Sequence, residues 1–288
     1  MLNTLPIIPM RRVFSLLLIF ITLRLFAFVE VKDAQFHVHG SHWRIMGVNL
    51  TSDQCSKEMF QSVAAFGWNC VRIAPETVTQ LKQYAKWAKH EQLKLYVVIT
   101  PNFPIESIGT LKNNRHIFAW EVTDVRQAKL IKENCSHHLV TLLVDSQLNN
   151  IDLGLMASEI DALSITLNPL ENKWVAPTNL YLGLRNCYMK SNELFQQLAR
   201  RMSLVEKPIL VVSCSYPRDK MFKLPGSSTS LRDSYFNFII NSKLPHTNTP
   251  LAGVFFQKWE LMPTEETQIN CTEMSIFPTD TLTREVLF

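Results

Sequence analysis

The sequence predicts an α/β protein with a (β/α)8 barrel of the TIM type. The 288-residue chain carries eight short runs of apolar and β-branched residues along almost its whole length, and helical patterns separate most of them. Runs that are apolar on both faces are typical of parallel strands covered by helices. Strands that alternate with helices indicate parallel pairing through right-handed crossovers. Eight such units in a chain of this length favour a closed barrel.

We expect eight strands and four clear helical segments, taken in chain order. The strands are Trp43–Leu50, Trp68–Pro75, Leu93–Pro101, His116–Thr123, His138–Asp145, Asp161–Asn168, Pro208–Ser215 and Leu251–Trp259. The helical segments are Ser56–Phe66, Thr77–His90, Lys190–Ser203 and Tyr235–Ile240, each with apolar residues at helical spacing. The connections after the third to fifth strands have weaker helical patterns: Pro101–Arg115 predicts little helix, and the pattern over Asp124–Cys135 is short. Phe36–Trp43 is typical of a small hairpin that closes the barrel floor.

The main rival to the barrel is an open doubly wound sheet, which usually carries a phosphate-binding loop after its first strand. The chain has 8 glycines, and none forms GxGxxG or GxxxxGK[ST], so we favour the barrel and expect no cofactor. The net charge of +4 is mild and no Lys/Arg run occurs, so we expect no nucleic-acid partner. His37, His39 and His42 lie together without a Cys or a carboxylate, and we expect no metal site.

The first 28 residues have the pattern of a targeting segment. Arg11 and Arg12 precede the apolar run Val13–Leu23, and Arg24 interrupts the run before it reaches the length of a spanning helix. Ala27 suits a cleavage site, while an uncleaved anchor is the alternative. We therefore divide the chain into a signal peptide or anchor at 1–28 and a barrel at 29–288. We expect a secreted or extracytoplasmic protein that touches a membrane only through an uncleaved N-terminal segment.

Cysteine and asparagine motifs fit that compartment without fixing any chemistry. All 6 cysteines follow the targeting segment, and none forms a CxxC motif. Some could pair in an oxidising compartment, and the connectivity stays open. Cys70 and Cys214 lie in predicted strands, where we expect buried free thiols. Three N-x-[ST] sequons begin at Asn49, Asn134 and Asn270.

Six segments, in order, carry a resemblance to a known family. They are FHVHGSHWRIMGVNL, GWNCVRI, HIFAWEV, DALSITLNP, KPILVVS and GVFFQKW, and together they span most of the chain after the targeting segment. This pattern resembles the endo-mannanases and cellulases of glycoside hydrolase family 5. In that family the first strand ends in Gly-x-Asn, here Gly47 and Asn49, and the second carries an arginine, here Arg72. The resemblance implies the same barrel and a sugar-binding mouth.

The resemblance also implies where the catalytic groups belong, and most of them are replaced. Retaining glycosidases need two carboxyl groups roughly 5–5.5 Å apart, an acid/base and a nucleophile. In this fold they stand at the C-terminal ends of the fourth and seventh strands. The replacements are Val125 for the acid/base, Ser213 for the nucleophile, Thr166 and Asn168 for the His and Tyr of the sixth strand, and Gln257 for the sugar-stacking Trp of the eighth. Valine cannot transfer a proton, and serine without a base is a poor nucleophile.

Other residues are candidates for the missing roles. Asp124 becomes the acid if the fourth strand lacks one residue at its end, and Glu260 and Asp145 are further carboxylates at strand ends. Each has the alternative of a solvated loop charge. As substrate-binding residues we name Asn49, Arg72, Trp120 and Trp259. The alternatives are a structural ion pair for Arg72, for example with Glu76, and core packing for the two tryptophans.

Three functions remain open at this point. The first is a catalytically impaired barrel, a pseudoenzyme that binds a polysaccharide or oligosaccharide or another protein. The second is a divergent active endo-β-mannanase or glucanase that uses relocated carboxylates, such as Asp124 with Glu260 or Asp145. The third is a membrane-tethered structural protein that binds no sugar. We expect the first, because five separate site positions are replaced while the residues that form the fold are kept.

Overall fold

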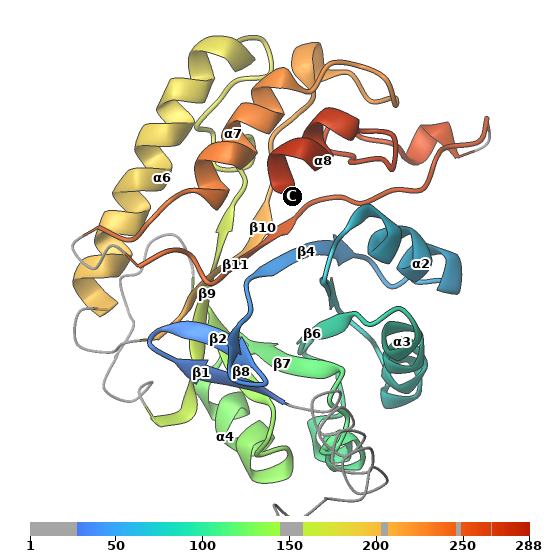
Figure 1. Cartoon of the computed structure of the whole chain (residues 1–288), viewed down its shortest axis with the longest axis vertical. Coiled ribbons are helices and arrows are strands. Elements are labelled where there is room, and N and C mark those ends of the chain that lie inside the picture. Colours follow the sequence, from blue (N-terminus) through green and yellow to red (C-terminus); the bar gives the residue numbers. More distant parts are fainter. Residues whose placement is uncertain (1–27, 145–157, 203–206, 246–248, 266) are drawn as a thin grey trace, which may run out of the picture.

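The computed structural model of the chain describes residues 28–144, 158–202, 207–245, 249–265 and 267–288. Eight parallel strands close into a barrel in chain order, as Figure 1 shows, and the predicted fold class is confirmed. The last strand pairs with the first through Gly253 and Ile45. The strands are β4 Ile45–Leu50, β5 Cys70–Ile73, β6 Lys94–Val98, β7 Ile117–Val122, β8 Leu139–Leu143, β9 Ala162–Leu167, β10 Ile209–Cys214 and β11 Gly253–Phe256.

Helices surround this barrel (Figure 1). They are α2 Lys57–Phe66, α3 Val78–His90, α4 Val125–Asn134, α6 Leu180–Met202, α7 Ser230–Ile240 and α8 Thr281–Leu287, with 3-10 turns η1 Ile105–Leu111, η2 Asp219–Met221 and η3 Gln268–Asn270. The four predicted helical segments are confirmed, although α6 begins at Leu180 rather than at Lys190 and α7 begins at Ser230. Little α-helix follows β6, as expected, because η1 is a 3-10 turn.

A small antiparallel sheet closes the N-terminal end of the barrel. It contains β1 Val29–Lys32, β2 Gln35–Val38 and β3 Ser41–His42. Phe36 in β2 is fully buried and its ring meets the ring of Phe118 edge to face, with centroids 5.8 Å apart. The predicted hairpin is therefore present, and its apolar side plugs the barrel floor.

Side chains along each barrel strand alternate between two separate cores. Cys70 belongs to the core inside the barrel, whereas Val71 and Ile73 belong to the core between strands and helices. Arg72 has the same parity as Cys70 and reaches past β6 to Glu121 on β7. This is the orientation that strict strand alternation predicts for the β5 side chains.

Gly47 on β4 has a packing reason to be glycine. A Cβ atom built on it would lie 2.5 Å from the Cδ1 atom of Phe255, whose ring fills the barrel interior from β11. Two non-bonded carbons cannot approach so closely, so any larger residue would push this ring aside. The glycine that carries part of the family resemblance therefore supports the interior packing.

A β-bulge in β10 changes which face of the barrel wall the last side chains of this strand point to. Val211 pairs with Ile165 and Ser213 with Thr166, so one residue of β10 is unmatched. Before the bulge Leu210 faces the inner core and Val211 the outer core; after the unmatched Val212, which faces inward, Cys214 faces the outer core. Strict alternation would point Ser213 outward; the extra residue instead points it into the barrel mouth.

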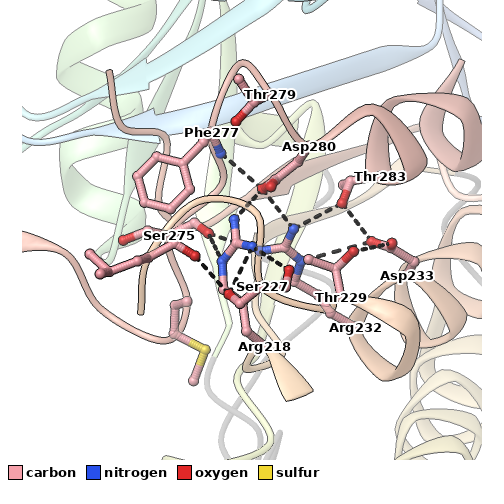
Figure 2. A network of polar contacts seen from close by, with 12 residues as sticks. Arg218, Ser227, Thr229, Arg232, Asp233, Ser275, Phe277, Thr279, Asp280 and Thr283 are labelled. Carbon is pink, nitrogen blue, oxygen red and sulfur yellow. Dashed lines mark hydrogen bonds and ion pairs between the residues drawn. The ribbon is translucent and has the colours of Figure 1, made fainter. Parts of the chain in front are cut away.

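A buried ionic cluster fastens the C-terminal segment to α7 (Figure 2). Arg218, from the loop after β10, and Arg232 on α7 both donate to the Oδ2 atom of Asp280, just before α8. Arg232 also donates to Thr283, which donates to Asp233 at 2.7 Å. Both guanidinium groups are fully buried. Two arginines therefore face two aspartates, and the charges balance inside the cluster.

Burial raises the pKa of the cysteine thiols. All six cysteines are free, and burial raises the pKa of the Cys55 and Cys187 thiols to about 12. Residues 1–27 of the predicted targeting segment, which was placed at 1–28, lie outside the described residues; the ring of Phe28 stacks on His137. No helix in the described part of the chain is long and apolar enough to cross a membrane.

Candidate functional site

The mouth of the barrel, at the C-terminal ends of its strands, contains an ion pair. Arg72 on β5 donates from Nε to Oε2 of Glu121 at 3.0 Å and from Nη2 to Oε1 at 2.5 Å. Burial opposes the charge of Arg72, but the Glu121 carboxylate outweighs it and raises the pKa of the arginine above its ordinary value. Both carboxylate oxygens are thus engaged in a bidentate pair, which is a strong and geometrically specific arrangement. Glu121 is held as a structural anion.

Asn49 on β4 joins this pair to β10. Its Oδ1 atom accepts from Nη1 of Arg72 at 3.4 Å, and its Nδ2 atom donates to the carbonyl of Val212 at 3.0 Å. That carbonyl belongs to the bulged residue of β10. The structure therefore brings Asn49 and Arg72 together, and it gives Arg72 the partner Glu121 in place of Glu76.

A second polar group fills the other half of the mouth. The Oδ1 atom of Asn168 accepts from the hydroxyls of Ser213 and Ser215, each at 3.1 Å, and its Nδ2 atom donates to Glu171 at 2.9 Å. The hydroxyl of Ser213 also lies 3.5 Å from Oε1 of Gln257 on the loop after β11. Four of the replaced positions of the family pattern thus face one another, because half-buried Thr166 lies beside Ser213 in the β9–β10 register.

The hydrogen bonds of Ser213 determine which chemistry this second polar group of the mouth can perform. Its hydroxyl donates to an amide oxygen, and an amide cannot accept the proton that a nucleophilic serine must lose. Glu171 is exposed at the rim and touches the group only through the Asn168 amide. The arrangement is suited to exchanging hydrogen bonds with neutral hydroxyl groups rather than to covalent chemistry.

Beneath the mouth, the barrel holds a buried hydroxyl layer. Tyr96 on β6 and Thr141 on β8 share a hydrogen bond, and both side chains are fully buried. Burial, aided by the Glu121 carboxylate, raises the pKa of Tyr96 well above its ordinary value, so the phenol stays protonated. This layer separates the charged mouth from the apolar floor.

Asp124 does not reach the mouth, and the expectation that it supplies the acid is wrong. Its Oδ1 atom accepts from the backbone N–H of Arg126 at 2.8 Å and caps helix α4, while its carboxylate pairs with the Arg126 side chain at 2.6 Å. The hydrogen bonds from Arg126 hold the pKa of Asp124 below its usual range, which is the wrong direction for a proton donor. Val125 is the first residue of α4 and packs partly against the outer core.

Trp120 and Trp259 lie in the outer core, where they cannot stack on a sugar. Both are fully buried, and Trp120 donates from Nε1 to Nδ1 of His138 at 3.0 Å. The ring of Trp259 packs on Phe66 with centroids 4.7 Å apart. Strand parity explains Trp120, since the residue next to inward-facing Glu121 must point outward. Core packing, the alternative we named, is what the structure has.

The remaining carboxylate candidates are Glu260 and Asp145. Glu260 pairs with Lys258 at 2.7 Å on the loop after β11. Asp145 lies outside the described residues. Within the described segments, no group of three or more His, Cys, Asp or Glu is arranged to hold a metal ion. His37 and His42 instead pack ring edge to ring face, with centroids 5.9 Å apart.

Sequence reasoning missed Glu121 and Glu171 for different reasons. Glu121 is the charged residue of an otherwise apolar strand, IFAWEV, and a charge in a buried strand must be paired. That signal was available, and parity with Arg72 would have identified the partner. Glu171 is an exposed loop residue after Pro169, and only the folded position of Asn168 connects it to the mouth.

Solved structures share this architecture, although sequence comparison finds nothing. No protein-family model and no curated protein sequence matches the chain. A glycoside hydrolase family 5 mannosidase from Rhizomucor miehei superposes with a TM-score of 0.68 at 13% identity, covering 91% of this chain and 97% of that one. In fold, this chain is similar to the family 5 glycoside hydrolases. The endo-1,4-beta-mannanase of the same organism gives a TM-score of 0.62 at 14% identity, covering 91% and 98%.

The likeness extends to a larger enzyme. A beta-glucuronidase from Bacteroides uniformis matches at 15% identity with a TM-score of 0.57, over 88% of this chain but 36% of its own. At such identities the comparison establishes the barrel and its resemblance to family 5, and function has to be argued from the mouth itself.

Proposed function

We propose that this chain is an exported, non-hydrolysing carbohydrate-binding barrel with the fold of family 5 glycoside hydrolases. The observation that carries the proposal is the chemistry of the mouth. Its buried carboxylate, Glu121, is held by Arg72, and Ser213 stands against Asn168 and Gln257. Double displacement needs a free acid and a free nucleophile. Neutral amides and hydroxyls instead match the alternating donors and acceptors of a sugar.

Two further features support binding over catalysis. Asn49 lies in β4 and Gln257 follows the neighbouring strand β11, and both side chains are half-buried, so both amides are partly accessible to a ligand at the mouth. Exposed Glu171 supplies an acceptor at the rim through its bond to Asn168. A ligand bound here would meet amides, hydroxyls and one carboxylate, which together favour a neutral polysaccharide or oligosaccharide over an acidic one.

The test measures binding and hydrolysis on the same purified protein. Titration calorimetry with soluble mannan, glucan and their oligosaccharides should give saturable binding, and reducing-end assays should give no turnover. A turnover of roughly 1–10³ per second would contradict the proposal. Absence of binding to every sugar would favour the structural protein that binds none.

A matched pair of variants locates the ligand. Gln257→Ala removes a half-buried amide from the mouth and should weaken sugar affinity about three- to tenfold, since one neutral hydrogen bond contributes about 0.5–1.5 kcal/mol. Gln197→Ala removes an exposed amide from α6 and should leave affinity unchanged. Equal effects of the two changes would place the sugar elsewhere.

A further inference from the structure

The three sequons of this chain differ sharply in their folded surroundings. N-linked glycosylation modifies the Nδ2 atom of the asparagine in Asn-x-Ser/Thr. The modified nitrogen must then stay at the surface, because the attached sugar is bulky and hydrated. Burial and hydrogen bonding of each asparagine therefore decide which site the fold accepts.

Asn49 cannot carry a glycan in this fold. Its Nδ2 atom donates to the carbonyl of Val212 inside the barrel mouth, and its Oδ1 atom accepts from Arg72. A sugar on that nitrogen would displace β10 and expose the ion pair. Glycosylation at this sequon is incompatible with the closed barrel.

Asn134 is only partly available. It is the last residue of α4, half-buried, and its Nδ2 atom donates to the carbonyl of Leu130 at 2.8 Å. A Cβ atom on Gly109 would lie 3.7 Å from its Oδ1 atom, so the amide rests against η1. Modification here would cost a helix-end hydrogen bond and a contact.

Asn270 meets every requirement. It ends η3 in the segment between β11 and α8, which extends away from the barrel in Figure 1, and Thr267 to Asn270 are all exposed. Its backbone is anchored, since Lys258 donates to its carbonyl at 3.0 Å. The sequon continues into buried Cys271 and half-buried Thr272, so the asparagine projects from a fixed base.

We propose that Asn270 is the N-glycosylation site of this protein. The Nδ2 atom of Asn270 forms a bond to C1 of an oligosaccharide carried on a lipid pyrophosphate. The bond between C1 and the phosphate oxygen breaks, the lipid pyrophosphate leaves with its electron pair, and the amide loses one proton. This inference rests on the predicted export of the chain and is independent of sugar binding at the mouth.

The experiment expresses the full chain in a eukaryotic secretory host and measures mass before and after an endoglycosidase that removes N-linked sugars. Wild type should lose mass on treatment, and Asn270→Gln should remove that loss completely. Asn134→Gln should leave it unchanged. Thr272→Ala should also abolish the loss, while Thr272→Ser, which keeps the sequon and the hydroxyl, should restore it.

A tail with an independent sequon after Phe288 reports whether the chain entered the secretory compartment. A modified tail on a chain whose Asn270 is unmodified overturns the assignment. If neither the tail nor Asn270 is modified, the chain did not enter the secretory compartment. This result overturns the predicted export, and the assignment of Asn270 with it, but does not bear on sugar binding. An endoglycosidase-sensitive mass loss that persists in Asn270→Gln overturns it as well.

Discussion

At the barrel mouth Arg72 meets one carboxylate and keeps 19% of its side chain exposed, whereas Arg218 and Arg232 beside α7 share Asp280 and have no exposed surface. The mouth pair sits beneath amides and hydroxyls that a ligand can reach. The C-terminal cluster is closed on every side by the segments that it joins. The same kinds of charged side chain thus form part of an accessible site at the mouth and a purely structural ion cluster beside α7. The two regions differ in their access to solvent.

The largest expected effect comes from breaking the closed cluster. Asp280→Asn leaves Arg218 and Arg232 buried without their shared counter-charge, and we expect a loss of about 3–5 kcal/mol in the free energy of unfolding. Burial already lowers the pKa of Arg232, so this guanidinium depends on its anions. Urea denaturation followed by circular dichroism measures the change.

The matched control for that change is Glu193→Gln. Glu193 pairs with Lys190 on the surface of α6, where the two side chains are 54% and 45% exposed. Such a pair contributes about 0–1 kcal/mol. Comparable losses in the two variants would mean that the buried cluster is no more than a surface pair.

The buried, neutral side chain of His138 adds a further test, because it makes the stability of the fold depend on pH. Burial lowers the pKa of His138 to about 4, and its Nδ1 atom accepts from Trp120. The unfolded chain takes up this proton near the ordinary histidine pKa of 6.5, so stability is full above that pH. It should fall by about 3 kcal/mol as the pH drops from there to the folded pKa, and then level off.

His138→Gln isolates this effect from the carboxylates that titrate over the same range. We expect the variant to be less stable at neutral pH but to lack the His138 part of the decline. Denaturation midpoints of both proteins, measured every half pH unit or so, give the difference. Parallel curves for variant and wild type would show that folding does not shift the pKa of His138.

Breaking the mouth pair should cost less than breaking the cluster. Glu121→Gln keeps the shape and one acceptor, and the partly exposed Arg72 can recover some hydration, so we expect a loss of about 2 kcal/mol. Glu171→Gln, at the exposed rim, should cost under about 0.5 kcal/mol because its bond to Asn168 survives. A loss in Glu121→Gln equal to that in Asp280→Asn would remove the distinction between the two regions.

The barrel could be predicted because its signals are local and repeated. Each strand is a short apolar run, and parity within one strand placed Arg72 inside without any knowledge of its neighbours. The resemblance to family 5 rested on the same runs. Capping residues such as Ser56 and Thr77 also confirmed helix starts that the apolar spacing had predicted.

The site was harder because it depends on contacts between distant strands. The β10 bulge, which turns Ser213 inward, leaves no mark in an apolar run and appears only in the pairing with β9. Trp120 and Trp259 were misplaced because sugar-stacking and core tryptophans have the same composition around them. Only the register shows which face each ring takes.

The smallest expected effect concerns Asp124, which the family pattern places near the acid. Asp124→Ala removes the cap of α4 and should cost about 1 kcal/mol, whereas Asp124→Asn keeps a capping oxygen and should cost a few tenths at most. Its pair with Arg126 adds little, because that side chain is 92% exposed. Both variants should bind sugar as wild type does, since the carboxylate faces Arg126 and not the mouth. Urea denaturation and titration calorimetry on the two variants check both statements. Loss of sugar binding in Asp124→Asn at unchanged stability would contradict this. It would show that the Asp124 carboxylate lies in the mouth and that α4 begins at a different residue in solution.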